Sequence, residues 1–257
     1  MEERFAVYVD NLRLKGSYFV PPHREKKKFP AVCFCHGIPG KKRVEGTPGS
    51  GYEDIARRFR EEGFAAFIFN FRGTGDSEGN FDLLSWTEDL AAIVNFITNL
   101  PEVDDRKINL IGFSGGGAAA LYHAVRNAGI NSVILGACPA HFDFLINENN
   151  LEEVLKNSRD LGIIRDLNYP PDALKWMNRV LSLRPEKEIS RLSPRPVLII
   201  HGMEDELVPV SHAHQLHKAA FEPKELILIE GAGHRLRNNR KVIDTCLEWL
   251  KNLLRQS

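Results

Sequence analysis

One serine stands in a setting that favours nucleophilic chemistry. Ser114 lies within a Gly-Phe-Ser-Gly-Gly run, directly after the apolar stretch 108–113 and just before the alanines 118–120. A sharp turn from a strand into a helix lifts a serine hydroxyl clear of a sheet, but it strains the backbone and leaves no room for bulky neighbours. Gly112 and Gly116, two residues away on either side, provide that room. We therefore expect Ser114 to be a nucleophile at such a turn.

A serine hydroxyl needs a base and an acid, and both follow later in the chain. The apolar run 196–200 leads into a loop that carries Asp205, and the run 225–229 leads into a Gly-rich loop that carries His234. The C-terminal ends of strands are where open α/β sheets hold their sites. We expect His234 to take the proton from Ser114 and Asp205 to fix the tautomer of the imidazole.

These motifs resemble the α/β-hydrolase superfamily along nearly the whole chain. The matching features are the serine run, the order serine, acid, histidine, a His-Gly turn at His36 after the strand-like run 31–35, and the Arg-Gly-Thr-Gly-Asp-Ser loop 72–77. The resemblance implies an α/β fold with a mostly parallel eight-stranded sheet flanked by helices. It also implies an oxyanion hole formed by the backbone N–H groups of Ile38 and Gly115.

The resemblance also separates the proposed acid and base from their neighbours. The pattern His-Gly-x-x-Asp-x-x-Val-Pro selects Asp205 over the adjacent Glu204 and Glu206. His201 is a rival for the base, but it occupies a structural position of that pattern. His36 belongs to its turn, where we expect it to orient loops through hydrogen bonds.

Strand-like and helix-like runs alternate along the chain, which is typical of a parallel sheet with helices on both faces. Two runs around the Asp10-Asn11 pair predict an opening hairpin. Further strands are expected at 31–35, 64–71, 108–113, 132–136, 196–200 and 225–229, and helices at 52–62 and 86–100. With the family resemblance, this alternation predicts an α/β-hydrolase core of residues 1–138 and 192–257.

Residues 139–191 interrupt this alternation, because they contain helical patterns and no strand candidate. The clearest helices are expected at 151–158 and 171–183. α/β-Hydrolases commonly insert a lid at this point, where it excludes water and shapes a substrate pocket. Four aromatic residues of the insertion are our candidates for lining that pocket: Phe142, Phe144, Tyr169 and Trp176.

The composition excludes several classes of protein. The 257 residues are 43% hydrophobic, which suits one domain with a large core, and 34 basic residues balance 34 acidic ones. This balance argues against a nucleic-acid or anionic-membrane partner. The four cysteines have no metal-ligand spacing, and His212, His214 and His217 have no carboxylate or thiol to complete a set. We expect a cytoplasmic enzyme that needs no metal or other cofactor; a homodimer stays open.

We therefore expect a serine carboxylesterase that forms an acyl-enzyme on short-chain or aromatic esters, similar to small bacterial carboxylesterases and feruloyl esterases. Dienelactone hydrolases carry a cysteine nucleophile, and the chain departs from them at Ser114. Cleavage by a proline-iminopeptidase-like or acyl-aminoacyl peptidase, thioester hydrolysis and acyl transfer use the same residues, so they stay open. A non-catalytic binding protein on the same fold predicts an incomplete set of catalytic residues, whereas all three are present.

Overall fold

The computed structural model describes residues 1–22, 28–40 and 51–256. The strands are β1 (Glu2–Val9), β2 (Leu12–Phe19), β3 (Phe29–Cys35), β4 (Ala65–Phe69), β5 (Val103–Phe113), β6 (Ile130–Gly136), β7 (Val197–Gly202) and β8 (Lys224–Ile229). The helices are α1 (Tyr52–Glu61), α2 (Trp86–Thr98), α3 (Gly115–Arg126), α4 (Leu151–Asp160), α5 (Ala173–Leu181), α6 (Pro185–Glu188), α7 (Ser211–Ala219) and α8 (Arg240–Gln256), with 3₁₀ turns at Ile189–Leu192 and Leu236–Asn238.

The strands form one eight-stranded sheet in the order β1-β2-β4-β3-β5-β6-β7-β8. β1 and β2 form the expected hairpin, and β2 is antiparallel to β4; every other neighbouring pair is parallel. Asp10 and Asn11 turn the hairpin with φ of 49° and 64°, a backbone region that Asp and Asn tolerate better than most residues. The mostly parallel eight-stranded sheet is confirmed.

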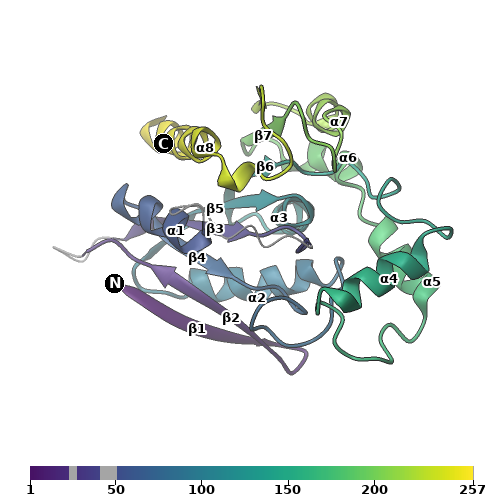
Figure 1. The fold of residues 1–257 in the computed structure, drawn as a ribbon. Helices are drawn as coiled ribbons and strands as arrows, with labels where there is room; N and C mark the ends of the chain where they lie inside the picture. The colour runs from purple at the N-terminus through teal and green to yellow at the C-terminus, as the bar shows by residue number, and fades with distance from the viewer. Residues whose placement is uncertain (23–27, 41–50, 257) are drawn as a thin grey trace.

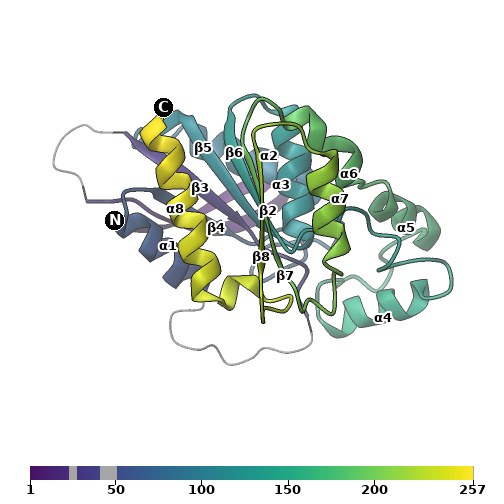
Figure 2. The same ribbon diagram turned by 90° about the horizontal axis from the view of Figure 1, so that it is seen from above.

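Helices cover both faces of the sheet. α1 and α8 lie on one face, and α2, α3 and α7 lie on the other (Figure 2). The side chains of β3 show how the strand serves both cores: Cys33 and Cys35 point into the core on the α2 and α3 side, whereas Val32 and Phe34 point into the α1 and α8 side. All four cysteines are buried and free. This alternation is what a strand that is buried on both faces requires.

The predicted elements shift by a few residues at their ends. The helix expected at 171–183 is shorter, because Asp172 precedes it as the N-cap and accepts a 2.9 Å hydrogen bond from the backbone N–H of Lys175. α6 and both 3₁₀ turns are too short to show a helical period in the sequence.

The insertion 139–191 contains α4, α5, α6 and most of one 3₁₀ turn, and no strand. Figures 1 and 2 place α4 and α5 side by side at one end of the molecule, away from α1 and α8. Two arginines tie it to the core. The guanidinium of Arg165 donates to the carbonyl oxygens of Gly75 at 2.8 Å and Ser77 at 2.6 Å, and Arg179 donates to Asp82 at 2.8 Å. These hydrogen bonds therefore attach the insertion to the segment that follows β4.

Candidate active site

Ser114 lies where β5 ends and α3 begins, with φ of 52° and ψ of −126°. A positive φ is rare for residues other than glycine and costs on the order of 1–3 kcal/mol. Two backbone hydrogen bonds hold this conformation: the Ser114 N–H donates to Gly136 O at 2.8 Å, and its carbonyl accepts from the Gly117 N–H at 2.9 Å. The surrounding structure thus enforces a strained turn at the serine.

The two glycines beside this turn permit close backbone contacts. A Cβ on Gly116 would lie 2.3 Å from the carbonyl oxygen of His36 and 2.4 Å from that of Cys35. A Cβ on Gly112 would lie 2.5 Å from the carbonyl oxygen of Gly116. Because backbone atoms move little, both positions require glycine, as the sequence pattern predicts.

The His-Gly turn packs directly against the serine. A Cβ on Gly37 would lie 3.0 Å from Ser114 Cβ, and one on Gly115 would lie 3.1 Å from Ile38 Cγ1. The backbone N–H groups of Ile38 and Gly115 have no hydrogen-bond partner in residues 1–22, 28–40 and 51–256. The structure therefore brings the two candidate oxyanion donors together and leaves both N–H groups free.

His36 fixes this turn in place. Its Nδ1 lies 2.8 Å from the Gly37 carbonyl oxygen and donates to it, and its Nε2 accepts from the backbone N–H of Phe71 at 3.2 Å. Burial lowers the pKa of His36 to about 4, so the ring is neutral at pH 7, as these two opposite roles require. The ring orients two loops, which agrees with the role expected from the sequence.

Asp205 is buried on the loop after β7 and is surrounded by donors. Its Oδ1 accepts from the N–H groups of Leu207 at 2.9 Å and Val208 at 2.8 Å. Its Oδ2 lies 2.8 Å from His234 Nδ1 and 3.3 Å from His201 Nε2. Burial alone would raise the pKa of this carboxyl, but the hydrogen bonds from His201, His234 and Val208 lower it well below its usual range. Asp205 is a carboxylate at any working pH.

His234 follows β8 on a loop that approaches β7 closely. A Cβ on Gly202 would lie 2.1 Å from the Ala232 carbonyl oxygen, so the absence of a side chain at Gly202 allows this approach. The His234 side chain is 20% exposed, which leaves its ring accessible to a substrate. The Ser114 hydroxyl has no hydrogen-bond partner among the residues that the structure describes. Bonds of this kind often tighten only when substrate binds.

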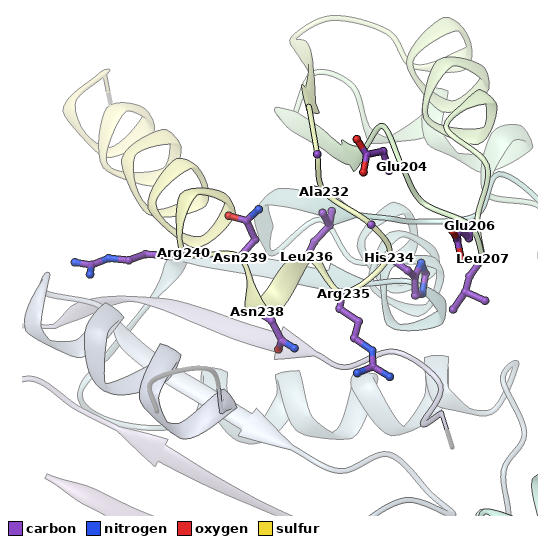
Figure 3. Close-up of a pocket in the computed structure, with 12 residues that line it drawn as sticks. Glu204, Glu206, Leu207, Ala232, His234, Arg235, Leu236, Asn238, Asn239 and Arg240 are labelled. Carbon is purple, nitrogen blue, oxygen red and sulfur yellow. The ribbon is translucent and has the colours of Figure 1, made fainter. Parts of the chain in front are cut away.

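A groove of about 790 Å³ lies along the His234 loop. Figure 3 shows His234 and Leu207 at one end of the groove and Arg240 at the other. Glu204 and Glu206, the two rivals of Asp205, also line it and are exposed. Neither glutamate bonds to His234, so the geometry favours Asp205 as the partner of the base.

The four aromatic candidates of the insertion lie in different surroundings. Phe142 and Trp176 are 1% and 3% exposed, and the Trp176 indole N–H donates to Phe81 O at 3.2 Å. The Tyr169 hydroxyl donates to Asp82 at 3.3 Å. Phe144 is 38% exposed, and its ring lies 4.8 Å from that of His212. Phe142 and Trp176 therefore belong to the core, whereas the side chain of Phe144 is more exposed than either of them.

The structure adds two residues that the sequence did not single out for the site. Leu83 Cδ1 would lie 3.2 Å from a Cβ on Gly115, so this buried leucine borders the candidate oxyanion hole. His201 contacts Asp205, although its place in the His-Gly-x-x-Asp pattern had only marked it as structural. Among the described residues, no group of three or more His, Cys, Asp or Glu side chains is arranged to hold a metal ion, and no helix is long and apolar enough to cross a membrane.

Comparison with known proteins places this geometry in context. Residues 34–243 match a family model described as the alpha/beta hydrolase family. The chain is 28% identical to the uncharacterized protein YfhR of Escherichia coli K12 over 88% of this chain and 70% of that protein. It is 25% identical to the uncharacterized peptidase YtmA of Bacillus subtilis over 76% and 75% of the two chains. Its fold is similar to that of ferulic-acid-bound Est1E from Butyrivibrio proteoclasticus, with a TM-score of 0.70, 21% identity and 98% of each chain covered.

Proposed function

Because the chain belongs to the alpha/beta hydrolase family, we propose that it is a serine hydrolase that cleaves carboxylic esters. One observation carries this proposal: Ser114 is held at φ 52° between β5 and α3, against the turn that contains Ile38. Strain of this kind is maintained where function requires it. The His234–Asp205 pair, 2.8 Å between Nδ1 and Oδ2, supplies an oriented base.

The chemistry follows from these groups. His234 Nε2 takes the hydroxyl proton as Ser114 Oγ bonds to the acyl carbon, and the carbonyl electron pair moves to the oxygen. The N–H groups of Ile38 and Gly115 stabilise that oxyanion, each contributing on the order of 3 kcal/mol. The C–O bond to the alcohol then breaks, and the alcohol leaves with the proton from His234. Water repeats the sequence on the acyl-enzyme and releases the acid.

We further propose short-chain or aromatic esters as the substrate class. Leu83 and Ile38 border the serine with apolar surface, which suits an uncharged acyl group. Est1E, a protein with a similar fold, binds ferulic acid, which is the kind of acid that an aromatic ester would release.

Labelling and kinetics test the proposal together. Ser114→Ala is expected to lose several orders of magnitude in turnover of p-nitrophenyl butyrate, because attack and proton transfer act as a unit. A fluorophosphonate should label the wild type and not this variant. Ser211→Ala, which removes an exposed serine at the start of α7, serves as the control and should keep both labelling and turnover. If Ser114→Ala kept more than about a tenth of the activity, Ser114 would not be the nucleophile.

A second candidate, an aminoacyl peptidase, has one observation in its favour: Glu204 and Glu206 line the groove beside His234, where carboxylates suit an amino group. The relative YtmA is named a peptidase, although an uncharacterized one. We favour the esterase because apolar side chains, Ile38 and Leu83, border the serine turn, and because the lid carboxylate of Asp143 is already paired with Arg184 at 2.6 Å. Comparing kcat/KM for p-nitrophenyl butyrate and proline-p-nitroanilide decides between the two; a better anilide would reject the esterase.

A further inference from the structure

Asp205 lies between two imidazoles, of which the proposed reaction uses one. His201, the penultimate residue of β7, is completely buried. Its Nε2 lies 2.9 Å from the Val208 carbonyl oxygen and 3.3 Å from Asp205 Oδ2. His234 approaches the same Oδ2 at 2.8 Å from the other loop. One carboxylate oxygen is therefore shared by a partly exposed histidine on the loop after β8 and a completely buried histidine near the end of β7.

The surroundings of His201 determine which nitrogen carries its hydrogen. Both neighbours of Nε2 are acceptors, so Nε2 must be the donor. Nδ1 is buried and has no hydrogen-bond partner in the described part of the chain, so a hydrogen placed there would have no acceptor among those residues. His201 therefore carries a hydrogen on Nε2, where it bonds to the Val208 carbonyl oxygen, with Asp205 Oδ2 3.3 Å from the same nitrogen. It cannot serve as a base for Ser114, because its lone pair faces the core.

We propose that His201 is a positioning residue of the candidate catalytic site: its Nε2–H holds the Val208 carbonyl oxygen and lies against Asp205 Oδ2, and so sets both the orientation and the basicity of the carboxylate that holds His234. This proposal rests on the function proposed above and deepens it. Val208 links His201 to the carboxylate: its carbonyl oxygen accepts from the His201 Nε2–H, and its own N–H donates to Asp205 Oδ1, so His201 fixes the loop that orients Asp205. By sharing the negative charge of Oδ2, it also weakens the pull of Asp205 on the His234 imidazolium.

The other ionisable groups near His201 do not reproduce this effect. His212, on α7, interacts with both His201 and Asp205, but its Nδ1 accepts from the Ala140 N–H at 3.1 Å. Burial, together with the charges of His141 and His201, lowers the pKa of His212 to about 4. His212 is thus neutral above pH 5, and the charged groups that couple to His201 in the working range are Asp205 and, through it, His234.

Two substitutions separate the donor from the bulk of the ring. In His201→Gln the amide nitrogen stands three bonds from Cβ, as Nε2 does, so the donor is kept. In His201→Leu the volume is kept and the donor is lost. We expect His201→Leu to lower kcat for p-nitrophenyl butyrate about tenfold with little change in KM, a loss typical of partners that orient a catalytic side chain. The acidic limb of its kcat/KM profile should move up by about half a pH unit, because Asp205 holds the His234 proton more strongly. His201→Gln should stay close to the wild type in both measurements.

An NMR titration with nitrogen-labelled histidine measures the shift in the protonation of His234 directly, without substrate. Its midpoint should rise in His201→Leu and not in His201→Gln. If both variants titrated like the wild type, His201 would be only a packing residue and the proposal would be overturned. Should His201→Leu fail to fold, His201→Asn replaces it, because the amide nitrogen of asparagine is one bond closer to Cβ than Nε2 is and does not reach the same position. Absence of ester turnover and of fluorophosphonate labelling in the wild type would reject the esterase function instead, and the NMR titration would still decide the role of His201.

Discussion

The turn that carries Ser114 and the corner that carries Asp205 and His234 are held in place by different means. Around Ser114 the constraint is backbone against backbone: a Cβ on Gly116 would meet two carbonyl oxygens within 2.4 Å. Around Asp205 the constraint is a set of hydrogen bonds to one carboxylate, from two backbone N–H groups and His234, with His201 in close contact. The first region is neutral, whereas the second contains a buried negative charge.

This difference predicts different responses to mutation and pH. A backbone constraint is insensitive to pH and fails when volume is added. A hydrogen-bonded carboxylate tolerates some change of volume but depends on charge and on which partners donate. The region of Asp205 and His234 should therefore respond to changes of charge and hydrogen-bond partner, whereas the turn at Ser114 should respond to changes of side-chain volume.

The largest expected effect removes the charge at the corner. In Asp205→Asn the amide oxygen is expected to stay with the N–H groups of Leu207 and Val208, so the new NH₂ group faces His234 and His201, both donors. His234 must then change tautomer and cannot accept the serine proton. We expect kcat to fall on the order of 10³- to 10⁴-fold with the fold intact.

Circular dichroism and turnover of p-nitrophenyl butyrate check this outcome. Asp143→Asn, at an exposed carboxylate paired with Arg184, is the matched control and should lose far less. A modest loss in Asp205→Asn would mean that charge at this corner matters little.

The next effect is the pH dependence of kcat/KM, which should fall about tenfold for each pH unit on the acidic side of the profile. Asp205, with its lowered pKa, stays ionised, and His36, with a pKa lowered to about 4 by burial, stays neutral between pH 5 and 8. The proposed base His234 is then the group whose protonation stops the reaction, so kcat/KM should fall on the acidic side with a slope of one.

Stability should change over the same range with a known sign. The unfolded His36 takes a proton near pH 6.5 and the folded one only near 4, so the free energy of unfolding should fall as the pH drops between these values. The contribution of Asp205 is present above about pH 4 and is lost only below it. Urea titrations at pH 7 and pH 5 measure the change in the free energy of unfolding. The kcat/KM profile is measured over the same range, and an acidic limb with a slope of two would contradict the single-base model.

The smallest expected effect reports strain at the serine turn. Ser114→Gly relieves the positive φ, whereas Ser114→Ala does not, so the glycine variant should be more stable by about 1 kcal/mol, although both are inactive. At Glu153, exposed in α4, the same pair of substitutions should have the opposite sign, because glycine weakens a helix. Denaturant unfolding measures both differences. Equal stability of the two Ser114 variants would show that the turn is unstrained.

The sequence predicted the serine turn and the sheet well, because both depend on local patterns. Glycines two residues from Ser114 follow from the geometry of one turn, and alternation along β3 follows from one strand. The loops that carry Asp205 and His234 were predictable from the sequence, since each follows the end of a strand.

Long-range contacts were not predictable in the same way. The contact of His201 with Asp205 depends on how one loop folds back over a strand end, and the pairing of Arg179 with Asp82 joins residues 97 positions apart. The aromatic type of Phe142 predicts burial but not which surface it meets; its 1% exposure depends on the path of the whole insertion.

The insertion also closes on itself. Near its start the carbonyl oxygen of Ala140 accepts a 3.1 Å hydrogen bond from the N–H of Glu186 near its end, so the chain leaves and re-enters the core at nearly one point. A segment joined in this manner can be lengthened, shortened or exchanged between homologous scaffolds without displacing the strands on either side. In this molecule the element that would shape the substrate site is a single excursion from the sheet, so a change in its length can leave the strands in place if it keeps the contacts of Arg165, Trp176 and Arg179 with the core.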